Sequence, residues 1–232
     1  RRQRQMCIRD SHIHEEEFHM RTIKKVASHI FIDGFGGMTQ GLFATLIIGT
    51  MIQQIGLLIG GSTGNVIYLL GKAAAALTSA GIGVGVAVKY GESPLVTVSA
   101  AVAAMVGGYA GKITGGTFFV DGNAVLSGPG EPLGAFIAAF AGITCGHLVS
   151  GKTKVDIIVT PVITIGAGSV VGLLVGPPIS QMMTGLGSII NWATEQRPFI
   201  MGIVVSVVMG MVLTLPISSA AVSYTHLTLP TN

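Results

Sequence analysis

Charged residues are scarce in this chain of 232 amino acids, where Asp, Glu, Lys and Arg together make up only 10% of the sequence. A soluble domain carries about 25% charged residues, so this chain lacks the polar surface that folding in water requires. Cys7 and Cys145 are its two cysteines, and they do not make a disulfide framework. Cys145 lies in an apolar segment and is predicted to be a small buried residue. These shortages predict an integral membrane protein.

Patterns typical of several catalytic and binding sites are also missing. The sequence shows no cluster of metal ligands, no Ser-His-Asp spacing and no basic footprint for nucleic acid. The GKTK run at 151–154 lacks the first glycine of a phosphate-binding loop and follows no strand. The GIGVGVAV run at 81–88 lies inside an apolar stretch and is not a dinucleotide fingerprint. We therefore expect no cofactor, no metal and no nucleic-acid partner.

Hydrophobic residues and glycine are abundant instead, at 50% of the chain and 34 residues respectively. Transmembrane helices tolerate glycine because small residues let helix backbones approach closely. Six apolar stretches are long enough to place as spans, which predicts an all-α membrane protein, a polytopic helical bundle with about six transmembrane spans. The stretches fall near 35–60, 64–88, 94–111, 130–150, 155–177 and 198–220.

Several of these stretches contain residues that weaken helices. Gly81, Gly83 and Gly85 lie in the second stretch, Pro161 lies in the fifth, and Gly-Pro-Pro follows at 176–178. A broken helix in hydrocarbon leaves unpaired backbone groups, so breaks must be buried in protein or line a cavity. The sequence therefore predicts Gly/Pro-broken helices, a pattern typical of transporters.

The two ends are expected not to belong to the protein. RRQRQMCIRDS at the start and VSYTHLTLPTN at the end both resemble translated sequencing-adapter read-through. MRTIKK, from Met20, is a plausible native start, so we expect a non-native leader at 1–19, a membrane domain at 20–221 and a non-native tail at 222–232. The apolar run at 198–221 meets this tail without a loop, so the domain is expected to be incomplete. The alternative for the leader is a genuine basic, disordered segment.

Basic residues in the short loops predict that the N-terminus is cytoplasmic. With that orientation, six basic residues lie on the cytoplasmic side and two on the other, while Lys72 lies within a span and is not counted. The six are Arg21, Lys24, Lys25, Lys89, Lys152 and Lys154, and the two are Lys112 and Arg197.

The Gly-Pro-Gly-Glu-Pro segment at 128–132 is the most informative motif. Gly and Pro deny it regular helix, so Glu131 is expected in a non-helical turn at the membrane edge or deeper. A carboxylate there can accept hydrogen bonds from sugar hydroxyls, and ionisable groups at membrane depth are costly and rare. The alternative is that Glu131 merely caps the helix beginning near Pro132.

Other polar groups in or near the spans have two interpretations each. Gln53, Gln54 and Asn65 carry amides that can bind substrate hydroxyls or hold helices together. His147 can bind substrate, relay a proton or be a hydrogen-bonded structural residue. Lys72 is expected to snorkel to the surface rather than to bind a ligand.

Together these stretches resemble one family, the membrane (C) subunit of a bacterial phosphotransferase-system sugar permease, of the EIIC type 2 or PfoR-like branch. The resemblance covers 27–221. It is carried by FIDGFGGMTQGLFATLIIGTMIQQIGLLIG, SAGIGVGVAVKYGESPLVTVSAAVA, GPGEPLGAFIAAF, LVSGKTKVDIIVTP, GLLVGPPIS and NWATEQRPFIMGIVVSVVMGMVLTLPISSAA.

The resemblance implies a multi-pass protein of the bacterial plasma membrane that takes up a sugar while a separate B subunit phosphorylates it. A separate A subunit would supply the phosphoryl group, which comes from phosphoenolpyruvate, and the C subunit forms no phosphoenzyme. Related permeases carry a Glu-Pro motif whose glutamate contacts the sugar, and Glu131-Pro132 is similar, although its flanking Gly-Pro-Gly differs. They are typically dimers, so a homodimer in the lipid bilayer is expected.

Two other functions remain open from the sequence. A membrane-embedded regulator that senses a ligand without transport is suggested by the PfoR naming in this branch. An ion-coupled transporter would need ionisable residues deep in several spans, and those are sparse here.

Overall fold

The computed structural model describes residues 29–120, 123–124, 126, 128–194, 202–203 and 206–207. The expected leader at 1–19, the start at Met20 and the tail at 222–232 lie outside the described residues. So do the basic residues Arg21, Lys24, Lys25 and Arg197 that entered the orientation prediction. The predicted span at 198–220 is described only at 202–203 and 206–207, which are helical.

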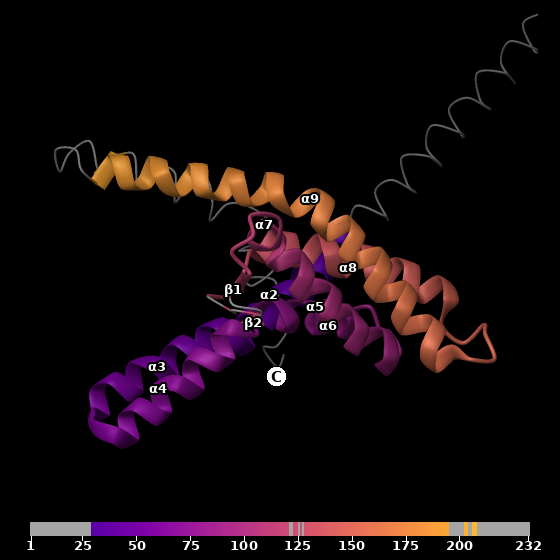
Figure 1. Ribbon diagram of the computed structural model, residues 1–232, viewed down its shortest axis with the longest axis horizontal. Coiled ribbons are helices and arrows are strands. Elements are labelled where there is room, and N and C mark those ends of the chain that lie inside the picture. The colour runs from indigo at the N-terminus through magenta and orange to yellow at the C-terminus, as the bar shows by residue number, and fades with distance from the viewer. Residues whose placement is uncertain are drawn as a thin grey trace, which may run out of the picture.

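Most of the described chain is helical, and Figure 1 shows its elements. The first run is continuous from π-helical η1 (His29–Gly34) through α2 (Phe35–Leu42), π-helical η2 (Phe43–Ile47) and α3 (Ile48–Ile59). The others are α4 (Gly61–Ala76), α5 (Thr78–Lys89), α6 (Pro94–Gly108), α7 (Ala110–Thr114), β1 (Phe119–Val120), β2 (Asn123–Ala124), α8 (Pro132–Val149) and α9 (Asp156–Thr194).

Three of these helical runs are long and apolar enough to cross a bilayer, namely Ile32–Ile59, Pro132–Val149 and Asp156–Gly185. Helices α4 and α5 pass the same test together, as one span bent by 52°. Helix α6 is apolar but shorter, with 15 residues. The predicted all-α membrane protein is confirmed. The antiparallel β1–β2 pair, with only two residues per strand, is a small addition to it.

The predicted positions of the helix breaks were wrong, although broken helices are present. Gly81, Gly83 and Gly85 lie within unbroken α5, and the interruption falls before it, at Leu77. The three glycines are held in helix by packing: a Cβ on Gly83 would lie 2.5 Å from the Ala100 oxygen of α6. Such close approach offsets the low helix propensity of glycine.

The prolines do not end the fifth predicted span either. Helix α9 contains Pro161, Pro177 and Pro178 and continues to Thr194, well beyond the expected end at 177. A proline removes one main-chain donor and can bend a helix without ending it. Figure 1 shows α9 changing direction along its length.

Small residues form the contact between α6, α8 and α9. A Cβ on Gly107 of α6 would lie 2.5 Å from the Gly134 oxygen of α8. On α9, a Cβ on Gly168 would lie 2.6 Å from the Ala138 oxygen, and one on Gly172 would lie 2.8 Å from the Gly107 Cα atom. Larger side chains would force these helices apart, so the glycines set their spacing.

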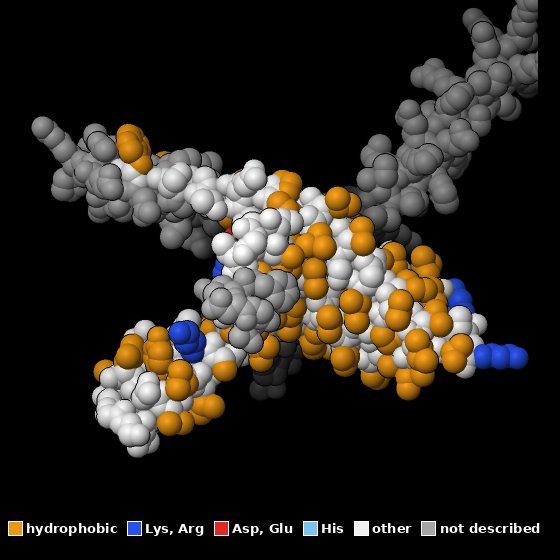
Figure 2. Space-filling model, in the orientation of Figure 1, with side chains coloured by type: hydrophobic (Ala, Val, Ile, Leu, Met, Phe, Trp, Pro, Cys, Tyr) orange, Lys and Arg blue, Asp and Glu red, His pale blue; other side chains and the backbone are white. Residues whose placement is uncertain are grey.

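The α3–α4 hairpin, which we call the arm, stands apart from the rest of the bundle (Figure 1). Its helices pack on each other through glycine: a Cβ on Gly56 would lie 2.5 Å from the Tyr68 nitrogen. Its outer faces are apolar and exposed, with Leu58 86% exposed. Figure 2 shows hydrophobic side chains spread over both the arm and the α5–α6–α8 region, as lipid-facing surfaces require.

Candidate functional site

Three interruptions of the helical backbone meet at one place, which we call the junction. They are Leu77 between α4 and α5, Tyr109 between α6 and α7, and the loop at 128–131 before α8. Hydrogen bonds join them. The Ser79 hydroxyl donates to the Pro129 carbonyl at 2.9 Å, and the Glu131 amide donates to the Gly108 carbonyl at 2.7 Å.

Tyr109 is the largest side chain in the junction, and it is 1% exposed. Its hydroxyl lies within hydrogen-bonding distance of two carbonyls, that of Gly128 in the loop and that of Ala76 at the end of α4, 3.2 Å away. Its single proton can serve one of these carbonyls at a time. Tyr109 therefore ties the loop to the end of α4 by way of the α6–α7 interruption.

Gly130 explains why this loop needs its glycine-rich sequence. Its φ angle is +75°, a conformation that other residues adopt at a cost. A Cβ there would also lie 2.5 Å from the Ser79 hydroxyl and 3.0 Å from the Gly108 carbonyl. Pro132 then begins α8, because proline needs no donor in the first helical turn. The motif thus encodes a tight loop pressed against α5 and α6.

The 15 residues of α6 are too few to cross the hydrocarbon core, whereas the 18 residues of α8 reach about 27 Å, so the junction lies near one edge of that core. Fifteen residues span about 22 Å, whereas the hydrocarbon core is about 30 Å thick. A helix that begins at one surface therefore ends before the other. Non-helical backbone at that depth is tolerated only where it is buried in protein or lines a cavity. The hydroxyls of Ser79 and Tyr109 satisfy this requirement by bonding loop carbonyls.

Glu131 precedes the first turn of α8 with a partly exposed side chain. Glu131 occupies the N-cap position of α8, but its side chain makes no capping hydrogen bond with the helix. The positive charge of Lys112, on α7, acts on this carboxylate. Glu131 therefore presents carboxyl oxygens as hydrogen-bond acceptors at the junction, within electrostatic range of Lys112.

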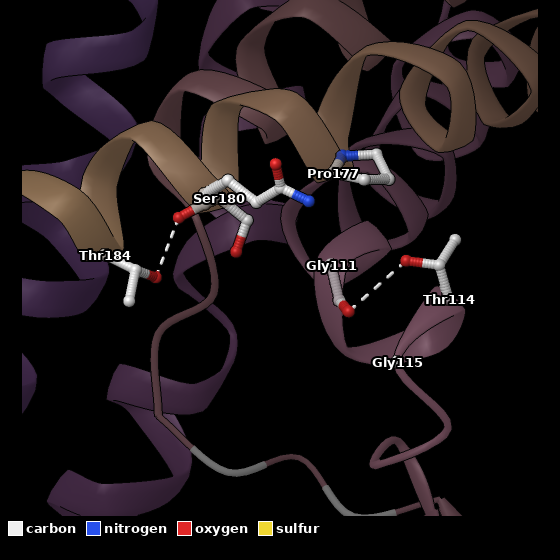
Figure 3. A pocket seen from close by; sticks show the side chains of 7 residues that line it. Gly111, Thr114, Gly115, Pro177, Ser180 and Thr184 are labelled. Atoms are coloured by element: carbon white, nitrogen blue, oxygen red, sulfur yellow. Dashed lines mark hydrogen bonds between the residues drawn. The ribbon is translucent and has the colours of Figure 1, made fainter.

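A pocket of about 450 Å³ lies between α7 and α9 (Figure 3). Its lining residues are Gly111, Thr114, Gly115, Pro177, Ser180, Gln181 and Thr184. Helix α7 thus borders the pocket with Gly111 and Thr114, Gly115 follows directly after it, and the same helix carries Lys112, whose charge acts on Glu131. The pocket and the junction are neighbours across this short helix.

The three amide residues expected in the site lie on the arm instead. The Gln53 side-chain nitrogen donates to the Gly71 carbonyl at 3.3 Å, a bond between α3 and α4 that fits its structural interpretation. Gln54 and Asn65 are exposed on the same two helices, as is Lys72 on α4. The structure does not bring these amides to Glu131, and their role in binding stays a prediction.

His147 lies near the opposite end of α8 from Glu131. Sixteen residues separate them, which is about 24 Å along a helix. The His147 Nδ1 atom lies 2.9 Å from a carboxylate oxygen of Glu92, in the loop between α5 and α6. One small ligand cannot contact both His147 and Glu131 in this conformation.

Sequence reasoning missed Ser79, Tyr109, Ser180 and Gln181. The Gly107-Gly108 pair before Tyr109 is a local sign of an interruption, but Ser79 carries no such sign. Ser180 and Gln181 were missed because the predicted span ended at 177. Within the described ranges, no group of three or more His, Cys, Asp and Glu side chains is placed to hold a metal ion.

Comparison with known protein families gives one match. The model of the family described as "Phosphotransferase system, EIIC" matches residues 32–228. This range includes every element from α2 to α9. No curated protein and no solved structure matches the chain.

Proposed function

Because the chain belongs to the phosphotransferase system EIIC family, we propose that it translocates a sugar and that Glu131 binds that sugar. Membership makes the chain a multi-pass membrane component of a bacterial sugar phosphotransferase system. It also implies a sugar substrate and partner components of the same system. The match does not favour the alternative of a ligand-sensing regulator without transport.

The observation that carries this proposal is the carboxylate of Glu131, which makes no capping hydrogen bond with α8 and lies where the helices are interrupted. A carboxylate accepts hydrogen bonds at two oxygens, so it can receive two neighbouring sugar hydroxyls. The backbone that positions it is held by Ser79, Tyr109 and the Gly108 carbonyl. Interrupted helices within the membrane are where transporters build substrate sites. The B subunit would then phosphorylate a hydroxyl of the bound sugar, with phosphoryl groups supplied by the A subunit.

The orientation with a cytoplasmic N-terminus remains part of the proposal. Lys89 is the last residue of the bent span, and Lys152 and Lys154 lie in the α8–α9 loop, whereas Lys112 lies at the junction end. The α5–α6 and α8–α9 loops meet, because the Ser93 and Ser150 hydroxyls are 3.2 Å apart. The three lysines therefore share one end of the bundle, which the positive-inside rule places in the cytoplasm.

This orientation places Glu131 toward the outside, and a cytoplasmic B subunit must meet the sugar from the other side. Transport therefore requires a conformational change that carries the sugar or opens a path to it.

Single-cysteine variants Thr117→Cys and Lys152→Cys test the orientation. A membrane-impermeant thiol reagent should label the first in whole cells and the second only in inverted vesicles, and the reverse result would invert the topology. We also propose a homodimer in the bilayer, which cross-linking in membranes can test.

The test of the site is sugar uptake by the full-length protein with its A and B subunits. Glu131→Gln should raise KM by about 10- to 100-fold, because hydrogen bonds to a charged group contribute about 1.5–3 kcal/mol. Glu92→Gln, the same change at the opposite end of the bundle, should leave KM within about twofold. Undiminished uptake by Glu131→Gln at normal membrane levels would falsify the site.

A further inference from the structure

The pocket between α7 and α9 has an uncharged lining in which polar groups are mixed with apolar ones. Its volume of about 450 Å³ lies within the range of about 300–1,000 Å³ that is usual for small-molecule sites. None of its seven lining residues carries a charge, and four of them carry a hydroxyl or an amide. Such a lining favours a neutral ligand with several hydroxyl groups over an ion.

The hydrogen-bonding capacity of the pocket comes from both helices. The Thr114 hydroxyl donates to the Ala110 carbonyl at 2.9 Å, and the Thr184 hydroxyl donates to the Ser180 carbonyl at 2.8 Å. Both oxygens keep lone pairs that accept hydrogen bonds. The Ser180 hydroxyl and the Gln181 amide make no hydrogen bond with any residue that the structure describes, so they can donate as well as accept. Figure 3 shows Ser180 and Thr184 on one wall and Thr114 on the other.

The geometry points to this pocket as the part of the sugar site that recognises the hydroxyl pattern, and we propose Ser180 and Gln181 as its specificity-determining residues. This inference rests on the proposed function, since it assigns to the pocket those hydroxyls that Glu131 does not contact. Helix α7 connects the two places, because it carries Lys112, whose charge acts on Glu131, as well as Gly111 and Thr114, which line the pocket. A phosphorylated sugar finds no positive side chain among the lining residues, so the pocket should prefer the neutral form.

Uptake of radiolabelled fructose, mannose, galactose, mannitol and galactitol provides the first test, with partner subunits present. For the sugar that the wild type accumulates, Ser180→Ala and Gln181→Leu should each raise KM by about 3- to 10-fold, because each removes one neutral hydrogen bond. The ranking among the five compounds should also change. Ser188→Ala is the matched control, because the Ser188 hydroxyl is exposed and donates to the Gly185 carbonyl of its own helix at 2.7 Å. The Ser188→Ala variant should keep the wild-type KM and the wild-type ranking of the five compounds.

Thiol labelling provides a second test that does not depend on transport. In a Cys7→Ser, Cys145→Ser background, Ser180→Cys should react with a small maleimide, and the transported sugar should slow this reaction at least about threefold. The phosphate ester of the same sugar should not slow the labelling. Equal protection by the ester would overturn the preference for a neutral ligand.

The outcomes separate the pocket from the proposed function. The pocket assignment would be overturned if Ser180→Ala and Gln181→Leu kept the wild-type KM and ranking and if sugar did not slow the labelling of Ser180→Cys. If Glu131→Gln still impaired uptake in that case, the proposal of sugar transport with Glu131 in the site would stand. If the wild type accumulates none of the five compounds and none slows labelling, the proposed function and the pocket assignment both fail.

Discussion

The two ends of α8 are held in different ways. At its N-terminal end, the main-chain carbonyls of Gly128 and Pro129 accept hydrogen bonds from the buried or half-buried hydroxyls of Tyr109 and Ser79. At its C-terminal end, His147 meets Glu92 at 2.9 Å, and the His147 side chain is 72% exposed. One end thus consists of irregular backbone enclosed by protein, and the other of a side-chain pair in which His147 is exposed and Glu92 is only 9% exposed.

This difference follows from what surrounds each end. Backbone groups away from water must find partners inside the protein, so the junction tolerates little change in shape. The exposed His147 side chain is solvated whether or not it pairs, so the His147 end depends less on the contacts of that residue. We therefore expect substitutions in the junction to cost more than equivalent substitutions near His147.

The largest expected difference is between two glycines of the same conformation. Gly130 and Gly151 both have a φ of +75°, but a Cβ on Gly130 would meet Ser79 and Gly108, whereas one on Gly151 would meet nothing within 4 Å. Gly130→Ala should cost about 2–5 kcal/mol, the sum of backbone strain and overpacking. Gly151→Ala should cost only the strain, about 1–2 kcal/mol. Unfolding of the purified proteins in detergent measures both, and equal losses would contradict the tight packing of the junction.

A smaller effect is expected for Tyr109→Phe. The substitution keeps the ring but leaves the carbonyls of Gly128 and Ala76 without the hydroxyl, at a cost of about 1–3 kcal/mol. Ser150→Ala removes the Ser93 contact at the other end and should cost about 1 kcal/mol or less. The same unfolding measurement ranks the two variants. A greater loss in Ser150→Ala would reverse the comparison between the ends.

The smallest effect is expected for His147→Ala. The Glu92 side chain is only 9% exposed, but the His147 side chain is 72% exposed, so solvent should limit the contribution of this pair to about 1 kcal/mol, and added salt should reduce it further. Unfolding at low and high salt measures this contribution. Sugar uptake provides a check on function: a KM change as large as that of Glu131→Gln would place His147 in the sugar path, as its sequence position had suggested.

The candidate site was only partly predictable from the sequence. Glu131 and Pro132 stood out because Gly and Pro at 128–132 deny regular helix, and the structure has a loop there. Ser79 and Tyr109 bond this loop from 50 and 19 positions away in the chain, and no local pattern encodes such pairings. Gln53 could bind substrate or hold helices together by its sequence, and in the structure it bonds Gly71 because α3 and α4 pack against each other in the arm.

The positions of the helix breaks were likewise not predictable from local sequence. Local propensity places them at glycine and proline, yet α5 continues through Gly81, Gly83 and Gly85, and α9 continues through Pro177 and Pro178. The interruptions occur at Leu77 and Tyr109, where neighbouring helices and the loop supply hydrogen bonds. Packing decides which weak points of a membrane helix remain helical.

The sequence alone determined that this protein is helical and embedded in a membrane, because apolar length and scarce charge act locally and additively along the chain. It also determined its family, through motifs that the family match confirms. Only the tertiary structure decided that the charge of Lys112 acts on Glu131, that α7 and α9 enclose a pocket, and that His147 pairs with Glu92 at the far end of α8 from Glu131. Such proximity arises from close contacts between helices distant in sequence, which single residues and their spacing do not specify.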